Sequence, residues 1–264
     1  MRAHMPSPAG LIDLHSHILP MIDDGAQNLR ESLEMAHLAW EDGITQMVAT
    51  PHDTGWGGSW QGTRESVQTL QVEMGHHEIP LQVLPGLEIR IDLNTPKQAR
   101  EGHLLTLNDS RYLLIELPFS HYPPYTDHVI FELQVAGFVP ILAHPERYSY
   151  LKTDPMKLFA LVERGALVQI TTSSILGEFG ARVRDFSRLL LEHRLAHVIS
   201  SDAHGASMRP PGLSQAVETA SRWIGEQQAT AMVTSVPEAI VNDQTWQTES
   251  PVEPKPERRW FRAR

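Results

Sequence analysis

The sequence of 264 residues contains no cysteine, which excludes disulfide bonds, thiolate metal ligands and every reaction that uses a cysteine nucleophile. No apolar run approaches the roughly 18 residues of a membrane-spanning helix. Glycine-rich dinucleotide fingerprints and phosphate-cradling P-loops are also missing. The N-terminal residues MRAHMPSPAG include no apolar signal region, so we expect a cytoplasmic protein.

Positive charge is in short supply, because 22 Lys and Arg face 32 Asp and Glu, giving a formal net charge of -10. This balance argues against nucleic acid as a partner, since phosphate backbones attract basic surfaces. Carboxylates that bind several divalent cations would account for part of the excess. The length suits a single α/β barrel, and 41% hydrophobic residues are enough to bury a substantial core.

Short apolar runs alternate with segments of helical periodicity along most of the chain. The runs predict buried parallel strands at residues 11–15, 46–50, 81–86, 112–117, 139–144, 167–171 and 197–201. Helices are predicted at 28–41, 63–76, 127–136, 155–164, 181–192 and 213–226, several with a glycine near the expected cap. This alternation predicts a parallel α/β architecture, with a closed or nearly closed barrel favoured over an open sheet.

One domain is predicted to span residues 11–245. Residues 1–10 are expected to form a disordered lead-in, and residues 246–264 a disordered tail with three prolines and a basic end. The tail fits a solvated terminus. The alternative is a weak contact with a partner or an anionic membrane surface, through Arg258, Arg259, Arg262, Arg264, Trp260 and Phe261.

Histidine and acidic residues gather where the apolar runs end. They are His15 and His17 at the first run, His52 after the second, Glu88 after the third, Glu116 and His144 ending the fourth and fifth, and Asp202 and His204 after the last. The carboxyl ends of parallel barrel strands share one rim, so these side chains are predicted to converge. His-x-His and Asp-x-His are each weak signals alone, but their joint placement predicts a metal site.

Three further residues are candidates near the same rim. Asp24 lies in the loop after the first run and is predicted to bind metal, although Asp-Gly is also ordinary turn chemistry. Arg147 and Arg209 follow His144 and His204 closely. A guanidinium binds phosphate oxygens through two parallel hydrogen bonds, so both are candidate phosphate ligands; the alternative is a surface salt bridge.

The segments HSHILPMIDDG, ATPH, GLEI, LNDSRYLLIEL, ILAHPERY and SDAH occur in this order. They resemble the polymerase-and-histidinol-phosphatase (PHP) superfamily. More narrowly, they resemble its bacterial capsule- and exopolysaccharide-associated tyrosine-protein phosphatases of the CpsB/YwqE type. The resemblance covers about residues 11–243. It implies a distorted (β/α)7 TIM-like barrel that holds three divalent metal ions, with Mn expected and Fe, Zn or Mg as alternatives.

The resemblance also implies a ligand partition and a substrate. One metal would be held by His15, His17, Glu88 and Asp202, a second by Glu116, His144 and a bridging Glu88, and a third by Asp24, His52 and His204. The implied reaction is direct hydrolysis of phosphotyrosine by a metal-activated water, with Arg147 and Arg209 neutralising the phosphate oxygens. The implied substrate is the phosphotyrosine-rich tail of a bacterial tyrosine autokinase that controls polysaccharide export.

The loop TGWGGSW (54–60) departs from the family pattern, and its Trp56 and Trp60 are expected either to stack on an aromatic substrate or to cover the barrel edge. Three other functions remain open. A small-molecule phosphoesterase, such as a histidinol-phosphate phosphatase, would use the same residues. An amidohydrolase often needs a carboxylated lysine at a strand end, but Lys97, Lys152, Lys157 and Lys255 lie outside the apolar runs. A non-catalytic module would keep metals only for structure.

Overall fold

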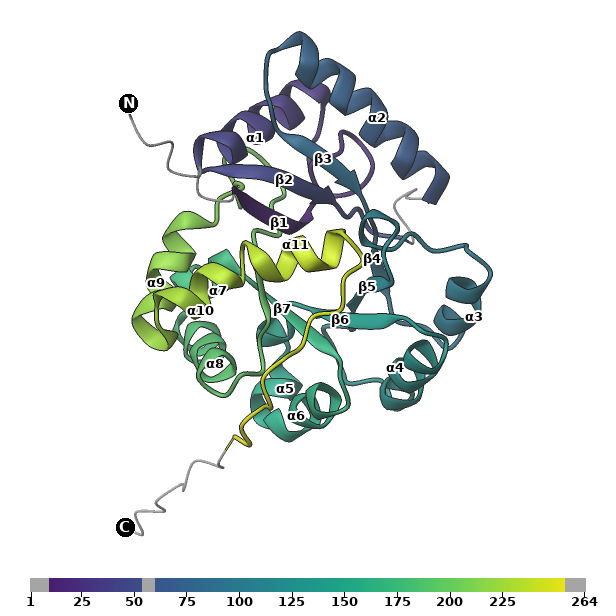
Figure 1. Ribbon diagram of the computed structural model, residues 1–264, viewed down its shortest axis with the longest axis vertical. Coiled ribbons are helices and arrows are strands. Elements are labelled where there is room, and N and C mark those ends of the chain that lie inside the picture. The colour runs from purple at the N-terminus through teal and green to yellow at the C-terminus, as the bar shows by residue number, and fades with distance from the viewer. Residues whose placement is uncertain (1–9, 54–59, 255–264) are drawn as a thin grey trace, which may run out of the picture.

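The computed structural model of the chain describes residues 10–53 and 60–254, without the side chain of Trp60 (Figure 1). The expectations for the lead-in up to residue 9, for the loop 54–59 with Trp56, for the Trp60 side chain and for the tail residues 255–264 lie outside the described residues.

Eight strands occur in the described part of the chain, and every pair of neighbours is parallel. Their bounds are β1 (Leu11–Ser16), β2 (Ile44–Ala49), β3 (Gln82–Pro85), β4 (Glu88–Arg90), β5 (Tyr112–Glu116), β6 (Val139–Ala143), β7 (Leu167–Thr171) and β8 (Val198–Ser200). They form a sheet of order β1-β2-β3 and a sheet of order β4-β5-β6-β7-β8. Two isolated parallel bridges, Ser16↔Ala203 and His52↔Glu88, link the two sheets.

All seven predicted strands are present, and the third run forms β3, but the prediction missed an eighth strand that follows it. Residues 81–86 were expected to form one strand with Glu88 behind it, but β3 ends at Pro85 and Glu88 begins the separate strand β4. Between them, a Cβ on Gly86 would lie 2.8 Å from Val48 Cγ1, so only glycine lets the chain pass β2 this closely. A strand of three residues is too short to show a hydrophobic period, and the sequence pattern therefore missed β4.

The six predicted helices are present with ends shifted by up to three residues. They are α1 (Leu29–Glu41), α2 (Trp60–His76), α4 (Thr126–Val135), α6 (Pro155–Glu163), α8 (Ala181–Glu192) and α9 (Ser214–Ile224). Asn28 caps α1, because its side chain accepts a hydrogen bond from Glu31 N. The described chain also has short helices that were not predicted: α3 (Thr95–Arg100), α5 (Ser149–Thr153), α7 (Thr172–Leu176), α10 (Glu226–Ala231), α11 (Ser235–Val241) and the 3₁₀ turns η1 (Leu107–Asp109) and η2 (Pro145–Arg147).

The strands pack against two separate hydrophobic clusters. The smaller cluster joins residues of β1, β2, β3, β5, β6, β7 and β8 to Val236, Ile240 and Val241 of α11. Figure 1 shows α11 lying across one end of the strands. The larger cluster packs the other strand faces against the surrounding helices. Both faces of the strands are therefore buried, which explains why they appear in the sequence as nearly continuous apolar runs.

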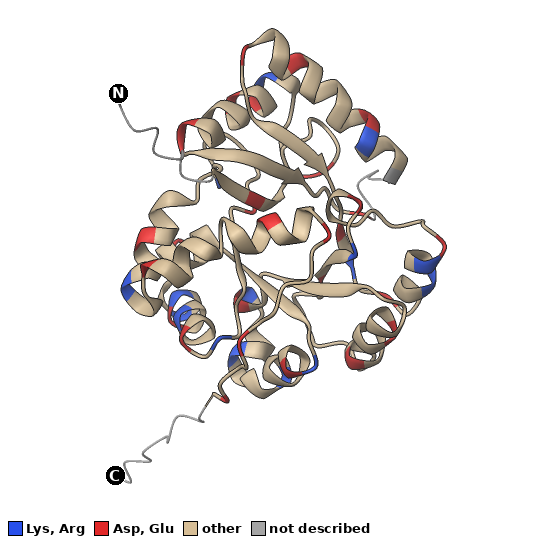
Figure 2. Ribbon diagram, viewed as in Figure 1, with Lys and Arg blue, Asp and Glu red and all other residues tan. Residues whose placement is uncertain are grey.

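Part of the predicted tail lies against the domain. Residues 246–254 have no helix or strand, but Trp246 N donates to Tyr112 Oη at 3.3 Å and Val252 N donates to His193 O at 2.8 Å. Figure 2 shows acidic and basic residues interspersed along the outer helices. Within the described residues, no helix is both long and apolar enough to cross a membrane.

Candidate functional site

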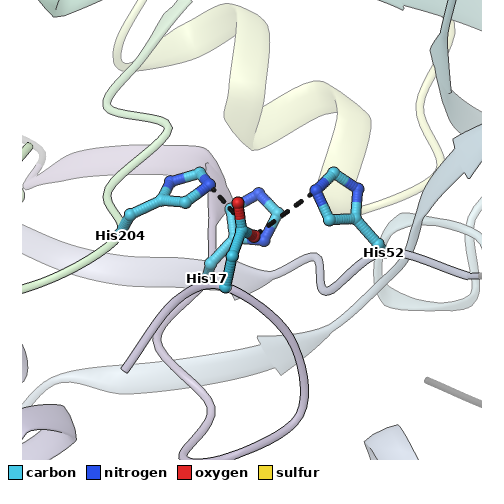
Figure 3. Close-up of side chains that lie close together, drawn as sticks. His17, His52 and His204 are labelled. Atoms are coloured by element: carbon cyan, nitrogen blue, oxygen red, sulfur yellow. Dashed lines mark ion pairs between the residues drawn. The ribbon is translucent and has the colours of Figure 1, made fainter. Parts of the chain in front are cut away.

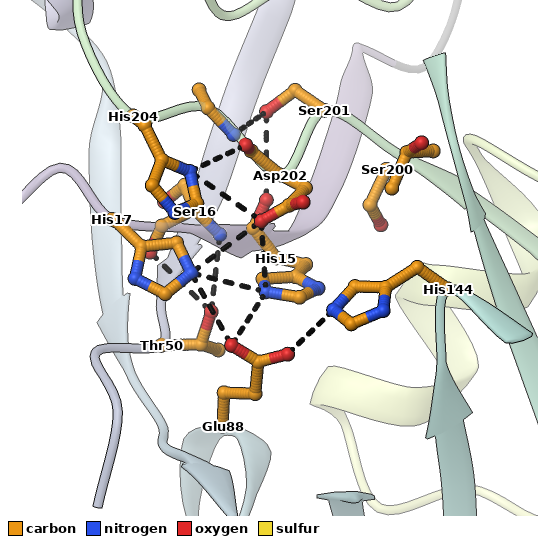
Figure 4. A network of polar contacts seen from close by, with 12 residues as sticks. His15, Ser16, His17, Thr50, Glu88, His144, Ser200, Ser201, Asp202 and His204 are labelled. Carbon is orange, nitrogen blue, oxygen red and sulfur yellow. Dashed lines mark hydrogen bonds and ion pairs between the residues drawn. The ribbon is translucent and has the colours of Figure 1, made fainter. Parts of the chain in front are cut away.

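His15 and His17 form the centre of a buried polar cluster at the end of β1 (Figure 4). The ring nitrogen Nδ1 of His15 lies 3.1 Å from Gln169 Oε1, and Nδ1 of His17 lies 2.7 Å from Asp23 Oδ2. Both partners are acceptors, because a carboxylate oxygen of Asp23 can only accept and Gln169 Oε1 also accepts the backbone N–H of His144. Each Nδ1 therefore carries a proton, and the two Nε2 atoms face each other at 3.3 Å.

Two carboxylates complete this arrangement. Glu88 Oε2 lies 3.4 Å from Nε2 of both histidines, and Asp202 Oδ1 lies 3.3 Å from His15 Nε2 and 3.5 Å from His17 Nε2. Lone pairs at these distances repel unless a proton or a cation lies between them. Burial opposes protonation, but the carboxylates outweigh it and raise the pKa of His15 and His17. The donor set of buried nitrogen and oxygen atoms fits a divalent metal ion.

The second part of the cluster lies at the start of β4 and at the carboxyl ends of β5 and β6. His144 Nε2 is 2.7 Å from Glu88 Oε1, and its Nδ1 is 3.3 Å from the hydroxyl of Tyr148. Glu116, the last residue of β5, groups with Glu88 and His52. Burial and the negative charge of Glu88 raise the pKa of Glu116. A raised carboxyl pKa is expected where several carboxylates lie close together with too little positive charge near them. A bound cation would supply that charge.

Asp24, His52 and His204 form the outer part, next to His17, and Figure 3 shows the three imidazoles converging. Asp24 Oδ1 lies 3.5 Å from Nε2 of both His52 and His204. His204 Nδ1 donates to the backbone oxygen of Asp202 at 2.8 Å, which leaves its Nε2 lone pair directed at Asp24. Burial lowers the pKa of His204, which favours the neutral imidazole that metal ions require.

All nine predicted metal ligands lie in this one cluster. Their ligating atoms form four groups, each within 4.8 Å: His17 with Asp24, His52 and His204; His15 with Glu88 and His144; His15 with His17 and Asp202; and His52 with Glu88 and Glu116. The groups share His15, His17, His52 and Glu88, so they overlap more than the partition implied by the family resemblance. Their geometry suits adjacent ions that share ligands.

Arg147 and Arg209 lie beside the cluster and contact the same carboxylate oxygen. Their Nη1 atoms lie 2.8 Å and 3.1 Å from Asp202 Oδ2, while Asp202 Oδ1 faces the histidines. The two side chains are 21% and 25% exposed, so they are accessible from solvent. His144, Asp202 and Arg209 all have positive φ, between 36° and 53°, a strained conformation that is common at functional sites.

Two supporting residues were not predicted. Asp23 accepts hydrogen bonds from His17 Nδ1 and from the backbone of His52, but nothing in the sequence separates its role from that of Asp24. Gln169 orients His15, and the available signal was a single polar residue inside an apolar run. The loop that carries Asp23 and Asp24 requires glycine at position 25, because a Cβ on Gly25 would lie 2.1 Å from His17 O.

Comparison with known proteins agrees with this geometry. The family model for capsular polysaccharide synthesis proteins CpsB/CapC matches residues 11–242. The tyrosine-protein phosphatase YwqE of Bacillus subtilis is 38% identical over 237 residues, covering 89% of this chain and 93% of YwqE. The tyrosine-protein phosphatase CpsB of Streptococcus pneumoniae is 30% identical over 245 residues, covering 89% of this chain and 99% of CpsB.

Solved structures extend the comparison to the fold. A crystal structure from work on B. subtilis YwqE and S. pneumoniae CpsB, described as metal-dependent tyrosine phosphatases, superposes with a TM-score of 0.89 at 37% identity, covering 93% of this chain and all of that one. The phosphotriesterase homology protein of Escherichia coli matches at a TM-score of 0.60 and 12% identity, covering 89% and 99% of the two chains, a likeness of fold alone. The sequence match over nearly the whole domain and the agreement in structure place this chain in the CpsB/CapC family.

Proposed function

We propose that this protein is a metal-dependent phosphatase that hydrolyses phosphotyrosine in proteins. The observation that carries the proposal is the contact of Arg147 and Arg209 with Asp202, whose other oxygen faces the His15–His17 pair. Two guanidinium groups, which can bind phosphate oxygens, thus lie next to a cluster of atoms that can bind metal ions. The names of the relatives, tyrosine-protein phosphatases YwqE and CpsB, support phosphotyrosine as the substrate.

The proposed cofactor is a set of three divalent ions, with Mn favoured and Fe, Zn or Mg as alternatives. Imidazole and carboxylate ligands without any thiolate suit these borderline and hard cations. The proposed ligands are His15, His17, Asp24, His52, Glu88, Glu116, His144, Asp202 and His204. We propose that the two sheets and the bridges between them form the distorted (β/α)7 barrel, with β3 and β4 dividing one strand position, inside a single domain of residues 11–245.

The chain's own residues have distinct tasks in this reaction. Divalent ions held by these nine residues would lower the pKa of a bound water and polarise a phosphoryl oxygen. Arg147 and Arg209 hold the remaining phosphoryl oxygens and orient the ester for in-line attack. Asp23 and Gln169 keep His17 and His15 in the tautomer whose Nε2 is free to bind a cation. Because phenolate is a good leaving group, this arrangement needs no strong general acid. The proposed reaction is direct hydrolysis, without a covalent enzyme intermediate.

The proposed partner is the phosphotyrosine-containing tail of a bacterial tyrosine kinase that controls capsule or exopolysaccharide synthesis. The family's description as capsular polysaccharide synthesis proteins supports this assignment. Because a kinase makes phosphotyrosine from ATP, we propose a cytoplasmic location for the reaction. An acidic tail approaching a protein with a net charge of -10 would depend on the arginines and bound cations for local attraction.

The test is metal-dependent turnover of matched substrates. The protein is stripped of metal, reloaded with Mn, Fe, Zn or Mg, and assayed on a phosphotyrosine peptide, the same peptide with phosphoserine, and histidinol phosphate. His144→Ala should abolish turnover, because it removes a proposed ligand of the buried cluster. His103→Ala is the matched control, since His103 is 61% exposed and lies outside the four groups.

Release of phosphate from the phosphotyrosine peptide, restored by metal and lost only in His144→Ala, is the expected result. Selective turnover of histidinol phosphate would instead assign the chain to small-molecule phosphoesters, with the same metal chemistry. If the fully metal-loaded protein released phosphate from none of the three, the phosphatase proposal would be wrong.

A further inference from the structure

The guanidinium of Arg147, which contacts Asp202, also lies over the rings of two phenylalanines. Its Cζ is 4.9 Å from the ring centroid of Phe119 and 4.8 Å from that of Phe179. Phe119 follows β5 and Phe179 follows α7, so two separate segments bring their rings to one arginine. Both contacts fall within the range of cation–π interactions, which fix the plane and position of the guanidinium.

The Phe119 ring also adjoins the metal-ligating cluster. It is stacked on the imidazole of His144, with centroids 5.8 Å apart and an interplanar angle of 16°, and it meets the ring of Tyr148 edge-on at 5.1 Å. Phe119 nevertheless remains 47% exposed and Phe179 remains 36% exposed. Two aromatic rings thus present apolar surface to solvent beside a group that binds phosphate in the proposed function.

From this arrangement we infer that Phe119 and Phe179 determine specificity by receiving the aromatic ring of an aryl phosphate whose phosphoryl group is held by Arg147. The inference rests on the proposed function and names its substrate class as phosphate esters of phenols. The ring of an aryl phosphate is one ester oxygen away from the phosphorus, so a phosphoryl group held by Arg147 would bring that ring close to the exposed surface of the two phenylalanines. Aromatic pairs favour offset or edge-on contact. The short side chain of phosphoserine offers no ring and gains nothing from either phenylalanine.

Binding of two non-hydrolysable phosphonates to the metal-loaded protein tests the inference without relying on turnover. Benzylphosphonate carries the ring, with a methylene group in place of the ester oxygen, and methylphosphonate carries the same charged group without the ring. For the wild type, benzylphosphonate should bind more tightly. Phe119→Leu and Phe179→Leu keep an apolar side chain but remove the ring, and each should reduce this preference by about threefold to tenfold.

Two further variants separate a specific role from a general loss of structure. Phe119→Tyr keeps the ring and should retain the preference for benzylphosphonate. Phe131→Leu is the matched control, because Phe131 is 56% exposed on α4, outside the site, and should change neither affinity. Metal content is measured for each variant, since Phe119 touches His144.

The outcomes distinguish this inference from the proposed function. An unchanged ratio of the two affinities in both Leu variants, or an equal loss for both phosphonates, would overturn the role of the two rings while leaving the phosphatase proposal intact. If the metal-loaded wild type bound neither phosphonate, the phosphate site itself would be wrong, and the inference would fall with it.

Discussion

Changing Asp23 to asparagine tests how the cluster of proposed metal ligands is held together. Asp23 Oδ2 accepts hydrogen bonds from His17 Nδ1 at 2.7 Å and from His52 N at 3.0 Å, and Oδ1 accepts from Gly25 N at 3.0 Å. An amide has only one oxygen. In its better orientation the introduced amide would keep the bonds to His17 and His52, but its NH₂ group would then face the N–H of Gly25.

The substitution also removes the negative charge next to His17. That charge holds the proton on Nδ1 and makes Nε2 a stronger donor to a cation, as in other carboxylate–histidine–metal arrangements. Loss of such a partner typically lowers metal affinity or activity by about 10- to 100-fold. Expressed as free energy, the expected loss of binding is about 1.4 to 2.7 kcal/mol.

The assay is a competition titration of Mn against a chromogenic chelator, followed by phosphatase rates at saturating metal. Asp92→Asn is the matched control, because Asp92 Oδ1 accepts a backbone hydrogen bond from Asn94 at 2.8 Å but lies outside the metal-ligating groups. If Asp23→Asn bound Mn as tightly as Asp92→Asn, with an equal rate, Asp23 would not support the cluster and the tautomer argument would be refuted.

Three other predictions concern pH, phosphate and metal. Burial lowers the pKa of His197 to about 4, below its ordinary value of about 6.5, so between these two pH values the unfolded chain binds more protons than the folded one. The free energy of unfolding is therefore highest above pH 6.5 and decreases as the pH is lowered from 6.5 to 4. In urea unfolding the wild type should lose about 2 kcal/mol between pH 7.5 and 5 that His197→Asn does not lose, and parallel curves would contradict this. Arg147→Lys should lower kcat/KM for a phosphotyrosine peptide by roughly 10- to 100-fold through loss of bidentate geometry, with the metal content unchanged; a wild-type value would exclude that role. Chelation should lower the Tm, because metal at 100 times its Kd stabilises the fold by about 2.7 kcal/mol, and an unchanged Tm would show that the ions do not bind the folded protein.

The location of the site could be predicted from the sequence because parallel strands impose it. The apolar runs marked the strand ends, and residues such as His15, His144 and Asp202 meet there irrespective of their separation in the chain. The prediction placed Glu88 next to the other candidate ligands although it missed β4. Glu88 pairs with His52 in the bridge between the two sheets, which brings it to the same rim.

Other features of the site depend on side-chain geometry that the hydrophobic periodicity of the sequence does not encode. Two adjacent acids, Asp23 and Asp24, differ only in which way the turn at Gly25 directs them. The sharing of His17 between two groups depends on distances of a few ångströms. The aromatic pair around Arg147 joins loops that are 60 residues apart in the sequence (119 and 179) and leaves no local pattern.

Asp202 has one oxygen directed at the histidines and the other at both arginines. In the proposed function, a cation bound to the first oxygen would withdraw charge from the second and so weaken its contacts with Arg147 and Arg209. A phosphate group that attracted the arginines away from Asp202 would in turn leave more negative charge for the cation. Binding of the two ligands is therefore thermodynamically linked, and each is expected to increase the affinity for the other by the same factor. A cell that limits the supply of the metal would therefore also lower the affinity of the enzyme for its substrate.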